Sequence, residues 1–405
     1  MPSSQKFDKW IVVTTINYPT DAVKALANQT GWHVVIVADK KTPTDWNLAG
    51  CDFLSIDMQE QLNYAVSSLI PYNSYTRKMI GYLYAIQNGA QWIYDTDDDN
   101  QPVDVGIKLF DTQPFVSGLS YGKECYQDCT NVRPLFNAYA FWGQPKIWPR
   151  GYPLEEVRKV NNETQYTLCK TQKVPAIQQG LVLQDPDVDA VYRLLNADEA
   201  TGLDVNFNKH APPIILNPGT FCPFNSQNTL FHYNGFWSLF LPVSVAFRVT
   251  DIWRGYFAQK LLHLTGNRLG FYPVNAVQKR NAHSYLADFK DEAQLYADAG
   301  KMVEFISKWT CKHNLFKECV QQLSSEFLEK KFWGEPDVAL ANAWIRDLDA
   351  IGYVFPSLQY HQAFLQQNYQ ACLQQYYQAC LQQNYQACLQ QYYQARLMYL
   401  LKLLL

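Results

Sequence analysis

The first hundred residues alternate short apolar segments with segments of helical pattern, and no other feature restricts the fold of this chain as strongly. Four segments are almost wholly apolar, as strands buried on both faces are: "KWIVVTTIN", "WHVVIVAD", "CDFLSID" and "QWIYD". Two segments between them carry helix signals: "PTDAVKALANQTG", with Thr20 or Asp21 near the cap, and "SYTRKMIGYLYAIQNGA". Alternation of this kind is typical of a parallel sheet covered by helices on both faces. The sequence therefore predicts an α/β fold with a mostly parallel central sheet.

Polar residues stand at the ends of these predicted strands. Thr14 and Thr15 end the first strand, Asp39 ends the second, and Asp95 ends the fourth. The carboxyl ends of parallel strands meet at one edge of a sheet, where ligands of α/β proteins bind. We therefore expect Thr14, Asp39 and Asp95 to converge on one ligand-binding crevice.

The stretch "DTDDD", residues 95–99, places four aspartates within five positions. Carboxylates this close repel one another unless water or a cation relieves the repulsion. A strand followed by D-x-D-D suits a divalent metal site for a nucleotide diphosphate, since Mn²⁺ and Mg²⁺ prefer oxygen ligands. We expect Asp97 and Asp98 to bind the metal, with Asp95 contacting the ribose or sugar or supporting the ligands. His283 could complete the metal shell as a neutral imidazole, and a solvated or core role is its alternative.

Three other interpretations of the aspartates were considered. An EF-hand loop would need Gly and Glu where Asn100 and Gly106 stand. A phosphatase with an aspartyl nucleophile would carry Thr or Val where Asp99 stands. A solvated acidic turn remains as the plain structural alternative.

Charge and composition narrow the classes of function. The formal net charge is −3 and we see no basic stripe, which argues against a nucleic-acid surface. The first residues, "MPSSQKFDKWIVVTTIN", hold no long apolar run, so neither a signal peptide nor a membrane anchor is expected. Cys125 and Cys129 are four residues apart, and two ordinary thiols or a local disulfide are expected rather than a metal site.

The pattern changes twice along the remainder of the chain. Residues 290–350 are helical in pattern throughout, and from Ser357 a segment of the type "QQNYQACL" repeats every eight residues. The apolar stripe of a helix would drift by about 80° per repeat, so no coiled-coil seam forms, and a frayed helix or disorder remain open. We expect an α/β domain at 8–288, a helical appendage at 289–356 and a low-complexity tail at 357–405.

Long segments of the chain resemble the STELLO proteins, a family assigned as glycosyltransferases of the Golgi membrane. The resemblance runs from about Lys9 to about Pro356 and is carried by "KWIVVTTINYPTDAVKAL", "GWHVVIVADKKTPTDW", "SYTRKMIGYLYAIQNGAQWIYDTDDD", "WPRGYPLEEV", "QQGLVLQDPDVDAVYRL", "FNSQNTLFH", "LPVSVAFRVTDIWRGYFAQKLL" and "AWIRDLDAIGY". A weaker similarity, to the reversibly glycosylated polypeptides or UDP-arabinose mutases, covers "DDD", "GLVLQDPDVDA" and "TDIWRG". Both imply a GT-A-like nucleotide-sugar-binding fold with a metal-binding DxD motif.

The resemblance also implies roles for single residues. Asp95, Asp97 and Asp98 match the D-x-D-D of the family, and Asp251 falls where GT-A enzymes often carry the acid that faces the acceptor. Asp251 could thus be a general base, with a helix N-cap as the alternative.

Further residues have implied contacts to the substrates. Arg77 and Lys78 precede the DxD strand by one helix, where basic groups commonly meet the diphosphate. Asp187 and Asp189, in "PDVDA", could contact the donor sugar or the acceptor, or could serve turn structure after Pro186.

These observations predict a metal-dependent glycosyltransferase, hexosyl or pentosyl, with a UDP- or GDP-linked sugar as donor and a glycan or protein as acceptor. Two alternatives remain open: a transferase-fold assembly protein without turnover, and a nucleotide-sugar mutase. The resemblance implies the Golgi apparatus as location and a membrane-bound glycan synthase as a partner, because plant members of the family associate with cellulose synthase. Mn²⁺ or Mg²⁺ is the expected cofactor.

Overall fold

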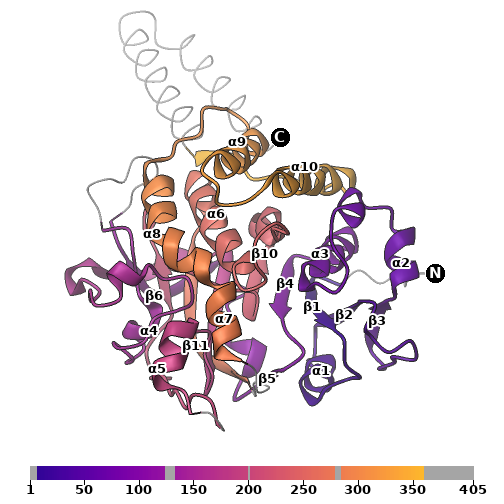
Figure 1. Ribbon diagram of the computed structural model, residues 1–405, viewed down its shortest axis with the longest axis horizontal. Helices are drawn as coiled ribbons and strands as arrows, with labels where there is room; N and C mark the ends of the chain where they lie inside the picture. The colour runs from indigo at the N-terminus through magenta and orange to yellow at the C-terminus, as the bar shows by residue number, and fades with distance from the viewer. Residues whose placement is uncertain (1–6, 124–132, 199–200, 279–283, 360–405) are drawn as a thin grey trace, which may run out of the picture. The chain divides into compact units, whose positions relative to one another are not determined.

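The computed structural model describes residues 7–123, 133–198, 201–278 and 284–359 (Figure 1). Residues Met1–Pro356 form one compact unit, and Ser357–Leu405 form a second. The predictions for His283, for Cys125 and Cys129, and for the eight-residue repeats lie outside the described residues.

Within the described residues, one mixed sheet of eleven strands organises the compact unit, in the order β3-β2-β1-β4-β10-β8-β11-β9-β6-β7, with β5 paired to β11. The four strands predicted in the first hundred residues are parallel neighbours: β1 (Lys9–Thr15), β2 (His33–Ala38), β3 (Cys51–Leu54) and β4 (Trp92–Thr96). Apart from the first residue of each, β1 and β2 are almost wholly buried, as strands covered on both faces must be. This part of the prediction is confirmed.

The middle of the chain completes the sheet. The remaining strands are β5 (Asn100–Pro102), β6 (Phe115–Tyr121), β7 (Tyr166–Lys173), β8 (Ile177–Leu183), β9 (Ile214–Leu216), β10 (Asn228–His232) and β11 (Leu269–Gln278). Strand β10 is antiparallel to both β4 and β8, so β8 and its parallel neighbour β11 run in the same direction as β4. The α/β class with a GT-A-like, mostly parallel central sheet is thereby confirmed.

Helices cover this sheet (Figure 1). They are α1 (Asp21–Ala27), α2 (Ile56–Gln61), α3 (Lys78–Gln87), α4 (Ala138–Phe141), α5 (Ala190–Asn196), α6 (Thr250–Leu264) and α7 (Tyr285–Asp291). The Thr20 hydroxyl caps α1 by accepting a hydrogen bond from the amide of Val23 at 3.1 Å, as its position before the helix predicted. Every residue of α6 is buried, so this helix is part of the core of the unit.

Three further helices follow in the described residues: α8 (Ala293–Lys308), α9 (Phe316–Glu329) and α10 (Glu335–Ala350). A disulfide joins Cys311 and Cys319, at the connection from α8 to α9. The Asp347 carboxylate of α10 accepts hydrogen bonds from the amides of Ala65 and Val66, at 2.8 and 2.9 Å. These helices lie within the compact unit, and the proposed boundary at residue 289 stays a prediction.

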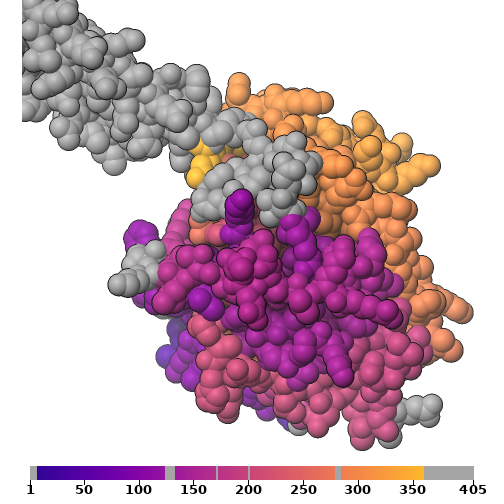
Figure 2. Space-filling view, turned by 90° about the vertical axis from the view of Figure 1, so that its left-hand side faces the viewer, coloured from indigo at the N-terminus to yellow at the C-terminus, as the bar shows by residue number. Residues whose placement is uncertain are grey.

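Figure 2 shows one face of the unit. Residues of the region between β6 and α5, coloured purple to magenta, cover most of it, and the orange helices from α7 onward lie beside them. The candidate site described below combines residues of both regions with the turn that follows β4.

Candidate functional site

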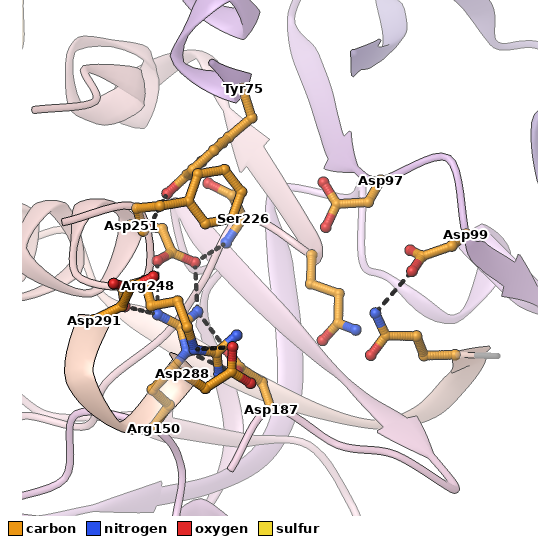
Figure 3. A pocket seen from close by; sticks show the side chains of 13 residues that line it. Tyr75, Asp97, Asp99, Arg150, Asp187, Ser226, Arg248, Asp251, Asp288 and Asp291 are labelled. Carbon is orange, nitrogen blue, oxygen red and sulfur yellow. Dashed lines mark hydrogen bonds and ion pairs between the residues drawn. The ribbon is translucent and has the colours of Figure 1, made fainter. Parts of the chain in front are cut away.

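A cavity of about 440 Å³ opens where β4 ends (Figure 3). Its lining comprises Tyr75, Asp97, Asp99, Arg150, Asp187, Ser226, Gln227, Phe247, Arg248, Asp251, Gln278, Asp288 and Asp291. Asp97 and Asp99 lie on one side of the cavity, and Arg150, Asp187 and Asp251 lie together on the other. A cavity thus lies at the carboxyl end of β4, but Thr14, Asp39 and Asp95, which were expected to converge there, are not among its lining residues.

A tight turn between β4 and β5 presents two of the four clustered aspartates to the cavity. The amide of Asn100 approaches the carbonyl of Asp97 at 3.5 Å, and Asp97 and Asp99 share the cavity side of the turn. The Asp97 side chain is 40% exposed. Asp99 accepts a hydrogen bond from Gln278 Nε2 at 3.0 Å, so β11 holds this carboxylate in place.

Asp98 turns away from the cavity. Its carboxylate accepts hydrogen bonds from the Thr15 hydroxyl and, at 3.0 Å, from Asn17 Nδ2. Asp97 and Asp99 thus line the cavity, whereas Asp98 ties the turn to the end of β1. Metal binding by Asp97 and Asp98 stays a prediction, but the contacts of Asp98 leave Asp99 as the companion of Asp97 in the cavity lining.

Lys78 is directed into the aspartate cluster from the start of α3. Its ammonium donates to Asp95 Oδ1 at 2.9 Å, to Asp97 Oδ1 at 2.7 Å and to the carbonyl of Ser226 at 3.2 Å. The side chains of Lys78 and Asp95 are both completely buried. Lys78 therefore does not face the cavity as a diphosphate ligand would, and of the two roles considered for Asp95 the geometry fits the supporting one.

A second buried cation stands behind the same carboxylate. Arg254 of α6 places Nη2 at 3.7 Å from Asp95 Oδ2, and it donates to the hydroxyl of Ser226 at 2.7 Å. Asp95 Oδ2 has no hydrogen-bond partner among the described residues, so the charge of Arg254 is its nearest compensation. Asp95 is thus held between two cations at the base of the cavity.

The carboxyl of Asp97 is a weaker acid than an ordinary aspartate. Burial of the carboxyl at the cavity floor and the negative charges of Asp99 and Asp95 raise its pKa to about 7, against the opposing effect of Lys78. An additional cation near such a carboxyl stabilises its ionised form and lowers its pKa. The direction of the shift therefore agrees with a place for a cation in front of Asp97.

Arg150 dominates the opposite wall. Its guanidinium donates to both oxygens of Asp187, at 2.7 and 2.8 Å, and to both oxygens of Asp251, at 3.1 and 3.0 Å. Gly151 allows this approach, because it has a φ of +81° and a side chain there would meet Ile252 of α6 at 2.3 Å. Arg150 is thus fixed between two carboxylates that both line the cavity.

The two carboxylates differ in how tightly they are held. Burial by itself raises the pKa of Asp187, but the Arg150 guanidinium outweighs burial and holds that pKa well below its usual range. Asp251, in the first turn of α6, forms the longer bonds to Arg150 and also accepts from the amide of Ser226 at 3.2 Å. Asp251 lines the same cavity as Asp97, and its role as a base stays a prediction.

Asp189 does not line the cavity. It caps α5, accepting from the amide of Tyr192 at 2.9 Å, and it accepts from Trp148 Nε1 at 2.6 Å. Burial raises the pKa of its carboxyl to about 6. These are the contacts of a helix N-cap, and the predicted contact of Asp189 with a substrate stays a prediction.

Three further predicted residues lie near the strand ends without lining the cavity. Asp39 accepts from the amide of Ser74 at 3.0 Å, and Arg77 donates to Gln59 Oε1. Thr14 lies in β1 beside the Thr15 that binds Asp98. Their predicted contacts to a nucleotide stay predictions.

The sequence interpretation missed several residues of the cavity. They are Asp99, Arg150, Arg248, Asp288 and Asp291. Arg150 stands between Pro149 and Gly151 in "WPRG", an irregular segment that fixes the backbone and could have drawn attention to it. Arg248 interacts with Asp288 at 3.7 Å, a contact between segments forty residues apart that no local pattern signals.

The donor set in the cavity suits a cation that shares its ligands with a substrate. No three side chains of His, Cys, Asp or Glu within the described ranges are grouped so that they could enclose a metal ion by themselves. Mg²⁺-type ions are commonly held by one or two carboxylates, with phosphate oxygens and water completing the shell. Asp97 and Asp99 provide such a pair, so the residues fit a metal that binds together with a diphosphate.

The sheet and the acidic cavity at its carboxyl edge define a GT-A-like α/β protein. A family model described as STELLO glycosyltransferases matches residues 248–380. The chain is 39% identical over 355 residues to "Probable glycosyltransferase STELLO1" of Arabidopsis thaliana. The aligned region covers 87% of this chain and 45% of that protein. It is 38% identical over 360 residues to "Probable glycosyltransferase STELLO2" of the same plant, covering 88% and 46%.

The chain therefore belongs to the STELLO family of glycosyltransferases, as the sequence motifs indicated. It spans about half the length of these two relatives. None of the helices in the described ranges is both long and apolar enough to cross a membrane.

Proposed function

We propose that this chain transfers a hexosyl or pentosyl group from a nucleotide-sugar donor, with a divalent cation at Asp97 and Asp99. One observation carries the proposal: Asp97 and Asp99 face the carboxylates of Asp187 and Asp251 across one cavity at the carboxyl edge of the sheet. Membership of a family of glycosyltransferases supports it, and UDP- or GDP-linked sugars are the proposed donors. A glycan or a protein is the proposed acceptor, and the Golgi apparatus the proposed location.

Each wall of the cavity has its own task in this proposal. When bound, Mn²⁺ or Mg²⁺ supplies positive charge that offsets the charge of the diphosphate leaving group. Asp97 and Asp99 would hold that cation. On the opposite wall, the Arg150 guanidinium keeps Asp187 ionised, so that its carboxylate can accept hydrogen bonds from sugar hydroxyls.

Asp251 is the proposed general base for the acceptor hydroxyl. Its bonds to Arg150 are longer than those of Asp187, so less is lost when it turns toward a substrate. A base must reach the proton that it removes, and its loss costs roughly a hundredfold or more in rate. Asp251→Asn should therefore bind donor nucleotide normally and transfer sugar at least about a hundredfold more slowly.

Binding is tested first, with the full chain. UDP or GDP together with Mn²⁺ should raise the melting temperature, because a ligand that binds only the folded state stabilises it. Asp97→Asn and Asp99→Asn should lose this Mn²⁺-dependent effect, and Asp98→Asn, from the same turn, is the matched control that should keep it. No stabilisation of the wild-type protein by any nucleotide would contradict the proposal.

Turnover is tested with a panel of nucleotide sugars and acceptors. Release of nucleotide diphosphate that depends on Asp251 supports transfer. Conversion of the sugar without an acceptor would instead indicate the mutase alternative. The double pairing of Arg150 with Asp187 and Asp251 is the observation that favours an assembly protein without turnover, partnered with a membrane-bound glycan synthase. Under that alternative, the wild type and Asp251→Asn should both bind nucleotide, and neither should transfer sugar.

A further inference from the structure

A buried ammonium group already occupies one oxygen of the aspartate that faces the cavity. Lys78 Nζ lies 2.7 Å from Asp97 Oδ1 and 2.9 Å from Asp95 Oδ1. Its third hydrogen is directed to the carbonyl of Ser226 at 3.2 Å. Since an ammonium group has three hydrogens, Lys78 has no donor left for a phosphate oxygen.

The burial of these groups fixes the arrangement. Lys78 and Asp95 are completely buried, whereas Asp97 is 40% exposed toward the cavity. Arg254 Nη2, also buried, stands 3.7 Å from the second oxygen of Asp95. The formal charges of Lys78 and Arg254 thus balance those of Asp95 and Asp97 before any ion enters the cavity.

We propose that Lys78 is a positioning residue that acts as an internal counterion, competing with the divalent cation for Asp97 and making metal binding depend on the nucleotide diphosphate. The inference rests on the proposed function. A cation that approaches Asp97 is repelled by the ammonium that shares the carboxylate, since like charges at this range interact strongly when little water screens them. The negative diphosphate reverses this balance, so metal and nucleotide bind tightly only together.

The first measurement is a titration of the wild-type full chain with Mn²⁺, followed by calorimetry or by the electron paramagnetic resonance of free Mn²⁺. Without nucleotide, we expect weak binding, and saturating UDP or GDP should tighten it at least about tenfold, as a change in local charge of this size requires. Equal Mn²⁺ affinity with and without a nucleotide that itself binds would overturn the proposal.

The second measurement removes the counterion. Lys78→Met alone leaves Asp95 buried without its ammonium partner and could prevent folding, so the informative protein is the double variant Lys78→Met/Asp95→Asn. This pair of changes leaves the net charge unaltered and frees Asp97 Oδ1. The double variant should bind Mn²⁺ without nucleotide several-fold more tightly than the wild type, because freeing Asp97 Oδ1 from a hydrogen-bonded ammonium outweighs the loss of the charge of Asp95, whose carboxylate does not line the cavity.

Two controls complete the design. In the Asp95→Asn variant, Asp97 is the carboxylate that remains of the two that pair with Lys78. The ammonium should then compete more strongly for Asp97, and this variant should bind Mn²⁺ more weakly than the wild type. Lys24→Met removes a surface lysine, 53% exposed, and should change nothing. An unchanged or weaker Mn²⁺ affinity in the folded double variant overturns the role of Lys78. Failure of the wild type to bind UDP or GDP would instead overturn the proposed function, and the Mn²⁺ titration of the variants still decides the counterion.

Discussion

Replacing Arg150 by Met should destabilise the compact unit strongly and in a pH-dependent way. The change removes four hydrogen bonds from the guanidinium to Asp187 and Asp251. The side chains of Arg150, Asp187 and Asp251 are only 7%, 11% and 8% exposed, so water in the cavity can replace the lost partner only in part. Removing one partner of a buried ion pair costs about 3–5 kcal/mol, and we expect a loss in this range near pH 7.5.

The pH dependence follows from the pKa of Asp187. In the wild type this pKa is held well below its usual range, so the pairing contributes stability above the ordinary aspartate pKa and loses it as the pH falls below that value. Without Arg150, burial is no longer outweighed and raises the pKa of Asp187 instead. The folded variant then takes up a proton on mild acidification, and its deficit relative to the wild type should shrink between pH 7.5 and pH 5.

Urea unfolding followed by tryptophan fluorescence, at both pH values, measures this effect. Arg158→Met is the matched control, because Arg158 is exposed, and it should change the unfolding midpoint little. Arg150→Lys should fall between the two, since it retains the charge and loses the forked geometry. A loss below about 1 kcal/mol, as for an exposed pair, or an equal loss at both pH values, would refute the reasoning.

Three further predictions concern other parts of the unit. His263 is buried and accepts a hydrogen bond from the amide of Gly219, and its burial, with Lys260 and Arg268 nearby, holds its pKa well below 6.5. The unfolded chain therefore binds the proton more readily, and the free energy of unfolding should fall as the pH drops below 6.5. His263→Gln should reduce the change in melting temperature between pH 7.5 and pH 5. Replacing Cys311 and Cys319 by Ser opens a short loop and should cost ~2–3 kcal/mol in the chain-entropy account, and an unchanged melting temperature would contradict the bond. Gly151→Ala should destabilise by about 2 kcal/mol more than Gly31→Ala, because both positions have a positive φ but only Gly151 faces a side chain at close range; equal melting temperatures would argue against that clash.

The parts of the fold that the sequence predicted depend on local pattern. The strands β1 and β4 are apolar because they are buried on both faces, and Thr20 precedes α1 because a hydroxyl there satisfies a free amide. A strand within residues 214–232 was expected from the sequence, but the antiparallel position of β10 between β4 and β8 was not predicted, because its partners lie far away in the sequence.

The same distinction holds for the site. The position of Asp97 after a strand predicted that it lies at the cavity. Whether Asp98 or Asp99 accompanies it depends on the geometry of the turn, which the sequence pattern does not determine. The burial of Lys78 and the pairing of Arg150 with Asp251 arise from contacts across long stretches of chain. Their spacing carries no periodic signal, so a pattern-based interpretation could identify the residue types but not the partners.

The position of β10 beside β4 affects how the protein is synthesised. Strand β4 ends at Thr96, whereas the strand that covers its free edge begins at Asn228. At the usual pace of a ribosome, the nascent chain spends on the order of ten seconds with this apolar edge unpaired. An unpaired strand edge is a template for association with other chains. Synthesis of this protein should therefore depend on chaperones that hold the N-terminal strands until Asn228–His232 have left the exit tunnel.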